Sequence, residues 1–135
     1  MPYTINFLED SAICFTKIYG ETVFEEHIQL WQQMDDHLTR HDIQMTYWLI
    51  DATHIWMSHQ NWVRVMEYNF RGIAGTISDS RVIPILVSSR PTRCFLRDLV
   101  VDREGDYKGY LDIPFFTDLE KAYAFLKLIQ MTNPG

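Results

Sequence analysis

A short stretch in the middle of the chain carries side chains that could act in acid–base or nucleophilic chemistry. It supplies a carboxylate, hydroxyls and imidazoles from Asp51, Thr53, His54, Ser58 and His59. Such groups catalyse a reaction only where they converge on one point beside an oxyanion donor. Their spacing does not require that convergence, so the sequence favours a protein that is not an enzyme.

The two histidines are not spaced as metal ligands. His54 and His59 stand at i and i+5, which does not place them on one face of a helix, and no third ligand lies near them in the sequence. Asp51 is instead expected to end a strand, Ser58 to cap the following helix, and both imidazoles to face solvent. No metal or cofactor is predicted.

Open α/β sheets bind ligands outside the carboxyl ends of their strands, which here are 51–58, 88–93 and the loop around Phe116, and the first two of these ends supply the candidate binding residues. These residues are Asp51, Thr53, His54, Trp56 and Ser58 after one expected strand, and Arg90 and Arg93 after the next. Trp56, between Ile55 and Met57, is the hardest tryptophan to bury. It is expected either to form a contact patch or lid, or to fold back over the end of the sheet.

Length and composition indicate one globular domain over residues 1–135. The chain is 47% hydrophobic and 22% charged, which is typical of a folded single domain. No apolar run approaches the roughly 18 residues of a membrane span and no basic-then-apolar leader opens the chain, so the sequence predicts no membrane span and a cytoplasmic location. Cys14 and Cys94 stand in apolar surroundings, which predicts two reduced, buried thiols.

The charge pattern argues against nucleic acid as a partner. The formal net charge is -6, and basic residues cluster in one region, where acids are interleaved among Arg90, Arg93, Arg97, Arg103 and Lys108. A phosphate-binding surface needs clustered cations without such neighbours. The pattern therefore predicts a solvated, ion-paired face.

Hydrophobic periodicity in the first half of the chain predicts a hairpin followed by helices and a strand. Alternating segments over 3–8 and 12–19 form the hairpin. A capping box of Thr22 and Glu25 begins a helix that runs to about residue 40. A second helix is expected to begin at Ser58.

Two nearly continuous apolar runs, over 45–50 and 82–87, predict strands buried on both faces of a parallel sheet. Pro84 in the second run cannot donate to a ladder, so a bulge is expected there. Ser89, followed by Pro91, is expected to cap a third helix.

The remaining segments complete an α/β fold. Residues 102–110 are expected to form a mobile loop and residues 112–116 a strand. Thr117 and Glu120 form a second capping box before the C-terminal helix. The order ββαβαβαβα predicts a mixed, mostly parallel sheet of about five strands with an antiparallel leading strand and about four helices.

Several segments together resemble a known family. The hairpin ending at Gly20, the helix from Thr22, the strand Tyr-Trp-Leu-Ile-Asp51, the strand from Arg81 and the closing Phe-Phe-Thr-Asp-Leu-Glu-Lys-Ala pattern of 115–122 resemble the SpoIIAA-like branch of the STAS domains (sulfate transporter and anti-sigma-factor antagonist). The resemblance covers nearly the whole chain. It implies a mixed sheet with helices, no cofactor, and function through protein contacts that phosphorylation regulates in some members.

The resemblance also implies a phosphorylation candidate. In STAS antagonists the strand that matches Leu49-Ile50-Asp51 is followed by an Asp-Ser-Ser-Gly-type motif, whose serine at the helix N-terminus is the phosphorylation switch. Here Ser58 stands near that helix start, and the loop has neither the acidic neighbour nor the glycine. A phosphate on Ser58 would meet backbone N–H groups at the start of the helix.

Two functions remain open. The first is a non-catalytic intracellular regulatory or interaction module that acts through an unidentified protein partner, and a homodimer through the leading edge strand is compatible with it. The alternative is a carrier of a small apolar or lipid-like ligand at the carboxyl ends of the strands. A carrier needs an apolar cavity on the order of several hundred Å³ near Trp56 and Phe95, whereas a partner module needs a flat exposed patch.

Overall fold

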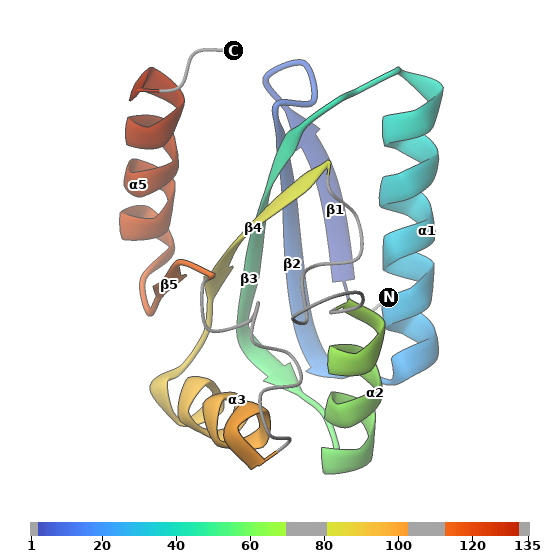
Figure 1. The fold of residues 1–135 in the computed structure, drawn as a ribbon, viewed down its shortest axis with the longest axis vertical. Coiled ribbons are helices and arrows are strands. Elements are labelled where there is room, and N and C mark those ends of the chain that lie inside the picture. The colour runs from blue at the N-terminus through green and yellow to red at the C-terminus, as the bar shows by residue number, and fades with distance from the viewer. Residues whose placement is uncertain (1–2, 70–80, 103–112, 133–135) are drawn as a thin grey trace.

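The computed structural model describes residues 3–69, 81–102 and 113–132. Figure 1 shows the order of elements, which matches the predicted ββαβαβαβα. The elements are β1 (Tyr3–Leu8), β2 (Ile13–Glu21), α1 (Phe24–Arg40), β3 (Thr46–Trp56), α2 (His59–Asn69), β4 (Val82–Val87), α3 (Arg90–Asp102), β5 (Phe115–Phe116) and α5 (Leu119–Thr132).

The five strands form one mixed sheet in the order β1-β2-β3-β4-β5. β1 pairs with β2 antiparallel, and the remaining neighbours are parallel. In Figure 1 the sheet stands between α5 on one side and α1 and α2 on the other, with α3 below the carboxyl end of β4. The predicted fold class is therefore confirmed.

Alternating side chains of the strands form two cores, one on each face of the sheet. On one face, α1 buries Leu30, Met34 and Leu38 against Trp48 and neighbouring strand residues. On the other face, α5 covers a smaller apolar cluster that consists of Ile13, Tyr47, Leu49, Ile85, Val87, Ala122 and Leu126. The first halves of β2 and β3 therefore lie between two helical layers.

The third strand is longer than its apolar run predicted. The prediction ended it at Asp51, but β3 continues to Trp56. The register with β2 shifts between Lys17 and Tyr19, whose partners are Asp51 and His54, so β3 has one extra residue there. The bulge lets the ladder continue past the polar residue that was expected to end it.

Both predicted capping boxes begin one residue too early. Thr22 still belongs to the extended chain, because its N–H donates to the carbonyl of Trp56 at 2.9 Å. The cap residue of α1 is Val23, whose N–H donates to the Glu26 carboxylate at 3.1 Å. At the last helix Asp118, and not Thr117, accepts the N–H of Glu120 at 2.9 Å, as expected from the better capping by aspartate than by threonine.

Pro84 lies in a regular strand without a bulge. β4 pairs with β3 at every position from Val82 to Val87. The N–H groups of Leu86 and Ser88 point away from β3 toward the β5 side, where they donate to the carbonyls of Pro114 and Phe116. Pro84 has the same parity as Leu86, so the position where its N–H would be faces the β5 side of β4, beyond the end of the two-residue β5. The missing donor therefore leaves no ladder bond unmade.

The structure bears on several smaller predictions. Ser89 caps α3 as expected, since its Oγ accepts the N–H of Thr92 at 3.3 Å. Cys14 is buried but Cys94 is exposed, so the prediction of two buried thiols is wrong for Cys94. The predicted loop over 102–110 begins too early, because α3 extends through Asp102, and its other residues lie outside the described ranges. Within those ranges no helix is long and apolar enough to cross a membrane.

Candidate functional site

The predicted site residues around Asp51 lie mainly on the second half of β3 and not on a loop. Asp51 is buried, and its Oδ1 accepts the backbone N–H of Thr53 at 3.1 Å and the Thr53 hydroxyl at 2.6 Å. These bonds hold the carboxylate against the bulge of its own strand. Asp51 and Thr53 therefore shape the strand that presents His54 and Trp56.

Trp56 is exposed at the end of β3. Its side chain is 60% exposed, and its carbonyl accepts the N–H of Thr22, so the backbone is held in the ladder. Ile55 lines a pocket on the α1 side of the sheet, and because side chains alternate along a strand, Trp56 and His54 point to the opposite face. Trp56 therefore neither folds back over the sheet nor forms a loop lid.

Tyr19 accompanies Trp56 on the same face. Tyr19 is the register partner of His54, and it is 39% exposed. Lys17, two residues earlier on β2, shares this face and is exposed. We call these residues, Lys17, Tyr19, His54 and Trp56, the Trp56 face.

The Trp56 face is open because α5 is too short to cover the whole sheet. α5 has 14 residues and is about 21 Å long, whereas β3 has 11 residues and spans about 36 Å. The helix packs over Ile13, Tyr47 and Leu49, in the first halves of β2 and β3. The carboxyl-terminal halves of these two strands extend beyond this cluster.

Ser58 caps α2, as predicted from the sequence. Its Oγ accepts the backbone N–H of Asn61 at 3.2 Å and the Asn61 side-chain amide at 3.0 Å. The other end of the Asn61 side chain accepts the N–H of Phe24 at 3.1 Å. Ser58 and Asn61 thus join the N-termini of α1 and α2 next to Trp56.

The two histidines of the predicted site are exposed, as expected. His54 lies on the Trp56 face, and His59 begins α2, where its ring meets the Phe95 ring edge-on at 5.7 Å between centroids. The hydroxyl of Ser58 is bonded to Asn61. Within the described ranges no group of three or more His, Cys, Asp or Glu residues has the arrangement of a metal site.

Arg90 and Arg93 line a second feature, a cleft of about 400 Å³ at the carboxyl ends of β4 and β5. The guanidinium of Arg93 lies 5.2 Å from the centre of the Phe115 ring. Cys94, next to Arg93 in the sequence, also lines the cleft. Thr117 and Lys121 line it from the C-terminal part of the chain. The loop around Phe116 is one of the strand ends that the sequence predicts for a site, but spacing along the chain could not place Lys121, because its position depends on β5 pairing with β4.

The predicted ion-paired face is present in part. Arg97 and Asp98 are both exposed, and Nε of Arg97 lies 4.0 Å from Oδ1 of Asp98. An exposed ion pair of this kind contributes little to stability. Arg103 and Lys108 lie outside the described ranges.

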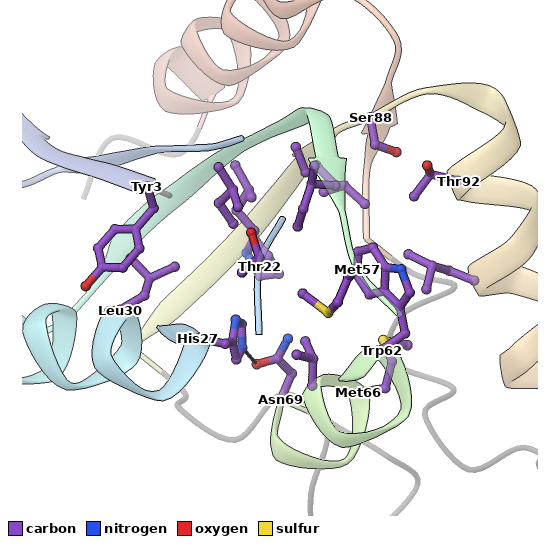
Figure 2. A pocket seen from close by; sticks show the side chains of 18 of the residues that line it. Tyr3, Thr22, His27, Leu30, Met57, Trp62, Met66, Asn69, Ser88 and Thr92 are labelled. Carbon is purple, nitrogen blue, oxygen red and sulfur yellow. Dashed lines mark hydrogen bonds between the residues drawn. The ribbon is translucent and has the colours of Figure 1, made fainter. Parts of the chain in front are cut away.

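A third feature, which the sequence did not reveal, is a pocket of about 90 Å³ between the sheet and helices α1, α2 and α3. Figure 2 shows the side chains that line it, among them Thr22, His27, Met57 and Asn69. His27 and Asn69 were not singled out because they are isolated polar residues on amphipathic helices. Their meeting depends on how α1 packs against α2.

A buried hydrogen-bond cluster borders this pocket. Nε2 of His27 lies 2.7 Å from Oδ1 of Asn69, and the indole N–H of Trp31 donates to the same oxygen at 2.6 Å. Burial lowers the pKa of His27 to about 4, and the hydrogen bond to Asn69 opposes that shift. The imidazole is therefore neutral at pH 7.

Comparison with known proteins assigns no family. No protein-family model, curated protein or solved structure gives a significant match to this chain. The five-stranded mixed sheet and its order of elements are compatible with a STAS-like fold.

Proposed function

We propose that this domain is a non-catalytic regulatory or interaction module of STAS-like type that binds a protein partner through the Trp56 face. The observation that carries the proposal is the 60% exposure of Trp56 at the end of a hydrogen-bonded strand. Tryptophan and tyrosine are enriched among the residues that contribute most to protein interfaces. Trp56 and Tyr19 supply both types on one face.

The surroundings of Trp56 support a role in binding a protein partner. The ladder holds its backbone, so little backbone entropy is lost when a partner docks. Lys17 and His54 provide polar groups beside the two aromatic rings, and a polar rim around an apolar centre is typical of interfaces. The partner expected for this surface is a protein with an apolar pocket that accepts the indole.

Ser58 gives the proposed interaction a means of regulation. It lies two residues after Trp56 and caps α2 through its Oγ. A phosphate on this oxygen would add negative charge at a helix N-terminus, where free N–H groups stabilise it, and next to the proposed contact surface. Phosphorylation of Ser58 would thereby change partner affinity without unfolding the domain.

The size of the pocket does not favour the alternative of a lipid-like carrier. About 90 Å³ between the sheet and the helices is well below the several hundred Å³ expected for such a ligand. The cleft of about 400 Å³ at the ends of β4 and β5 is large enough, but Arg90, Arg93 and Lys121 line it, and three cationic side chains do not suit a neutral apolar ligand. We therefore prefer a surface-binding module to a lipid carrier.

Photo-crosslinking tests the proposal directly. A benzophenone side chain replaces His54, which lies beside Trp56 on the same face, in one variant and Met131 in a control. Met131 is 78% exposed near the carboxyl end of α5, and Figure 1 shows this end of α5 far from the carboxyl end of β3. In the native host, position 54 should yield a discrete crosslinked protein that excess wild-type domain suppresses and excess Trp56→Ala does not. Equal products from both positions, or none from position 54, would refute the proposed surface.

A further inference from the structure

We propose that the pocket between the sheet and helices α1, α2 and α3 is a binding site for a small, neutral, mainly apolar molecule that carries one hydrogen-bonding group. This site is separate from the Trp56 face, because Ile55 faces the pocket whereas Trp56 points to the other side of the sheet. Binding there would be a second property of the domain, independent of the proposed protein contact.

The residues that line the pocket favour an apolar ligand. Its lining is dominated by side chains of the sheet and the covering helices, including Ile18, Ile50, Leu30, Val65 and Leu96. A water molecule needs several polar partners to be held in a buried space of this kind. A volume of about 90 Å³ has room for a compact organic molecule, which the apolar walls would hold better than water.

Thr22 supplies the polar contact. It is 4% exposed, and its Oγ1 has no hydrogen-bond partner among the described residues. Figure 2 shows Thr22 among the pocket-lining side chains, between Tyr3 and Met57. A buried hydroxyl without a partner is unfavourable, and a hydroxyl or carbonyl group on the bound molecule would satisfy it.

The charges around the pocket indicate a neutral molecule. His27 lines the pocket and is neutral at pH 7, so it does not attract an anion. Glu26 also lines the pocket and repels one. A cation would lose its hydration against apolar walls, and Glu26 is the single carboxylate that lines the pocket among the described residues.

Two methionines give the site a direct spectroscopic probe. Met57 and Met66 line the pocket and are 7% and 3% exposed. Their flexible thioether side chains can adapt to a bound ring. Methyl signals of these two residues should therefore shift when the pocket is filled.

Methyl NMR titration with benzene, phenol and benzoate tests the inference. Benzene and phenol should both shift the Met57 and Met66 methyl signals, and phenol should bind about fivefold more tightly, the gain from one neutral hydrogen bond. Benzoate should produce no shift. In Thr22→Val the two neutral probes should bind equally, and Ala52→Leu, which places a larger side chain in the pocket, should abolish binding of both.

Three results would overturn the inference. Methyl signals that do not respond to any probe would show that the pocket binds none of them. A preference for phenol that persists in Thr22→Val would remove Thr22 as the polar contact. Intermolecular NOEs between benzene and the Met57 and Met66 methyl groups locate the probe in wild-type protein, so their absence would contradict the site even if Ala52→Leu fails to fold.

Discussion

His27 is held neutral by burial between α1 and α2. Burial lowers its pKa from the ordinary value of 6.5 to about 4. Below about pH 6.5 the unfolded chain therefore binds a proton that the folded protein does not bind until about pH 4. Because the unfolded state binds more protons in this window, stability falls as the pH is lowered through it.

The contribution of His27 can be measured by difference. Urea unfolding of the wild type and of His27→Gln between pH 7 and about pH 4 should show a steeper loss of stability in the wild type, by up to about 3 kcal/mol across the window. Carboxylates titrate in both proteins and cancel in the comparison. Parallel pH profiles would contradict the assignment of a buried neutral imidazole.

At the same scale, the sequence was least informative about individual side chains on helices. Cys94 stands between Arg93 and Phe95, before Leu96, and it was predicted to be buried because of its apolar neighbours. On a helix, however, successive side chains point in different directions, and in α3 Leu96 is buried while Cys94 and Phe95 are exposed. Neighbours in sequence therefore gave no information about the exposure of this thiol.

Among the elements, α2 begins at a cap that the sequence predicted and the structure contains. The Ser58 Oγ accepts the N–H of Asn61, and Asn61 also bonds to the first turn of α1. Ser58→Ala should lower the free energy of unfolding by about 1 kcal/mol through loss of the cap. Ser58→Asp should retain most of it, because aspartate is an equally good cap.

Thermal or urea unfolding measures the Ser58 effect, and partner binding provides the second readout. The proposed contact is made by the Trp56 face, so Ser58→Ala, which cannot be phosphorylated, should bind the partner as the unphosphorylated wild type does. Loss of binding without loss of stability would show that the hydroxyl itself belongs to the interface.

Element order followed from hydrophobic periodicity, whereas element ends did not. The apolar run before Asp51 predicted the core of β3, but its extension depends on a bulge and on pairing with β2. Thr22 and Thr117 matched the capping pattern, yet each helix begins one residue later. Thr22 pairs with Trp56 in the sheet, so the cap of α1 is Val23. At α5, Asp118 takes the cap position next to Thr117. Strand pairing decides the end of β3 and the start of α1, and a local sequence pattern does not predict that pairing. The start of α5 follows instead from the better cap at Asp118.

For the whole molecule, the candidate surfaces arise from contacts between distant segments. Trp56 was singled out from the sequence, but Tyr19 joins it only through the register of β2 with β3. Lys121 joins Arg90 and Arg93 because β5, which leads into α5, pairs with β4. Sequence spacing therefore identified part of each group and missed Tyr19 and Lys121, which distant segments supply.

The edges of the sheet bear on self-association. β1 is an edge strand, and the other edge, β5, has two residues. A homodimer through β1 stays a prediction from the sequence. β1 borders the Trp56 face, because Thr4 is the register partner of Lys17, so such a homodimer would form next to the proposed contact surface.

Native mass spectrometry of the protein purified from its own host tests the central claim most directly. We expect the mass of a complex with another protein for the wild type and for Met131→Ala. This mass should be absent for Trp56→Ala, whose fold is checked by circular dichroism. A wild-type protein that carries no partner, or a complex that persists in folded Trp56→Ala, would contradict a protein-binding role for the Trp56 face.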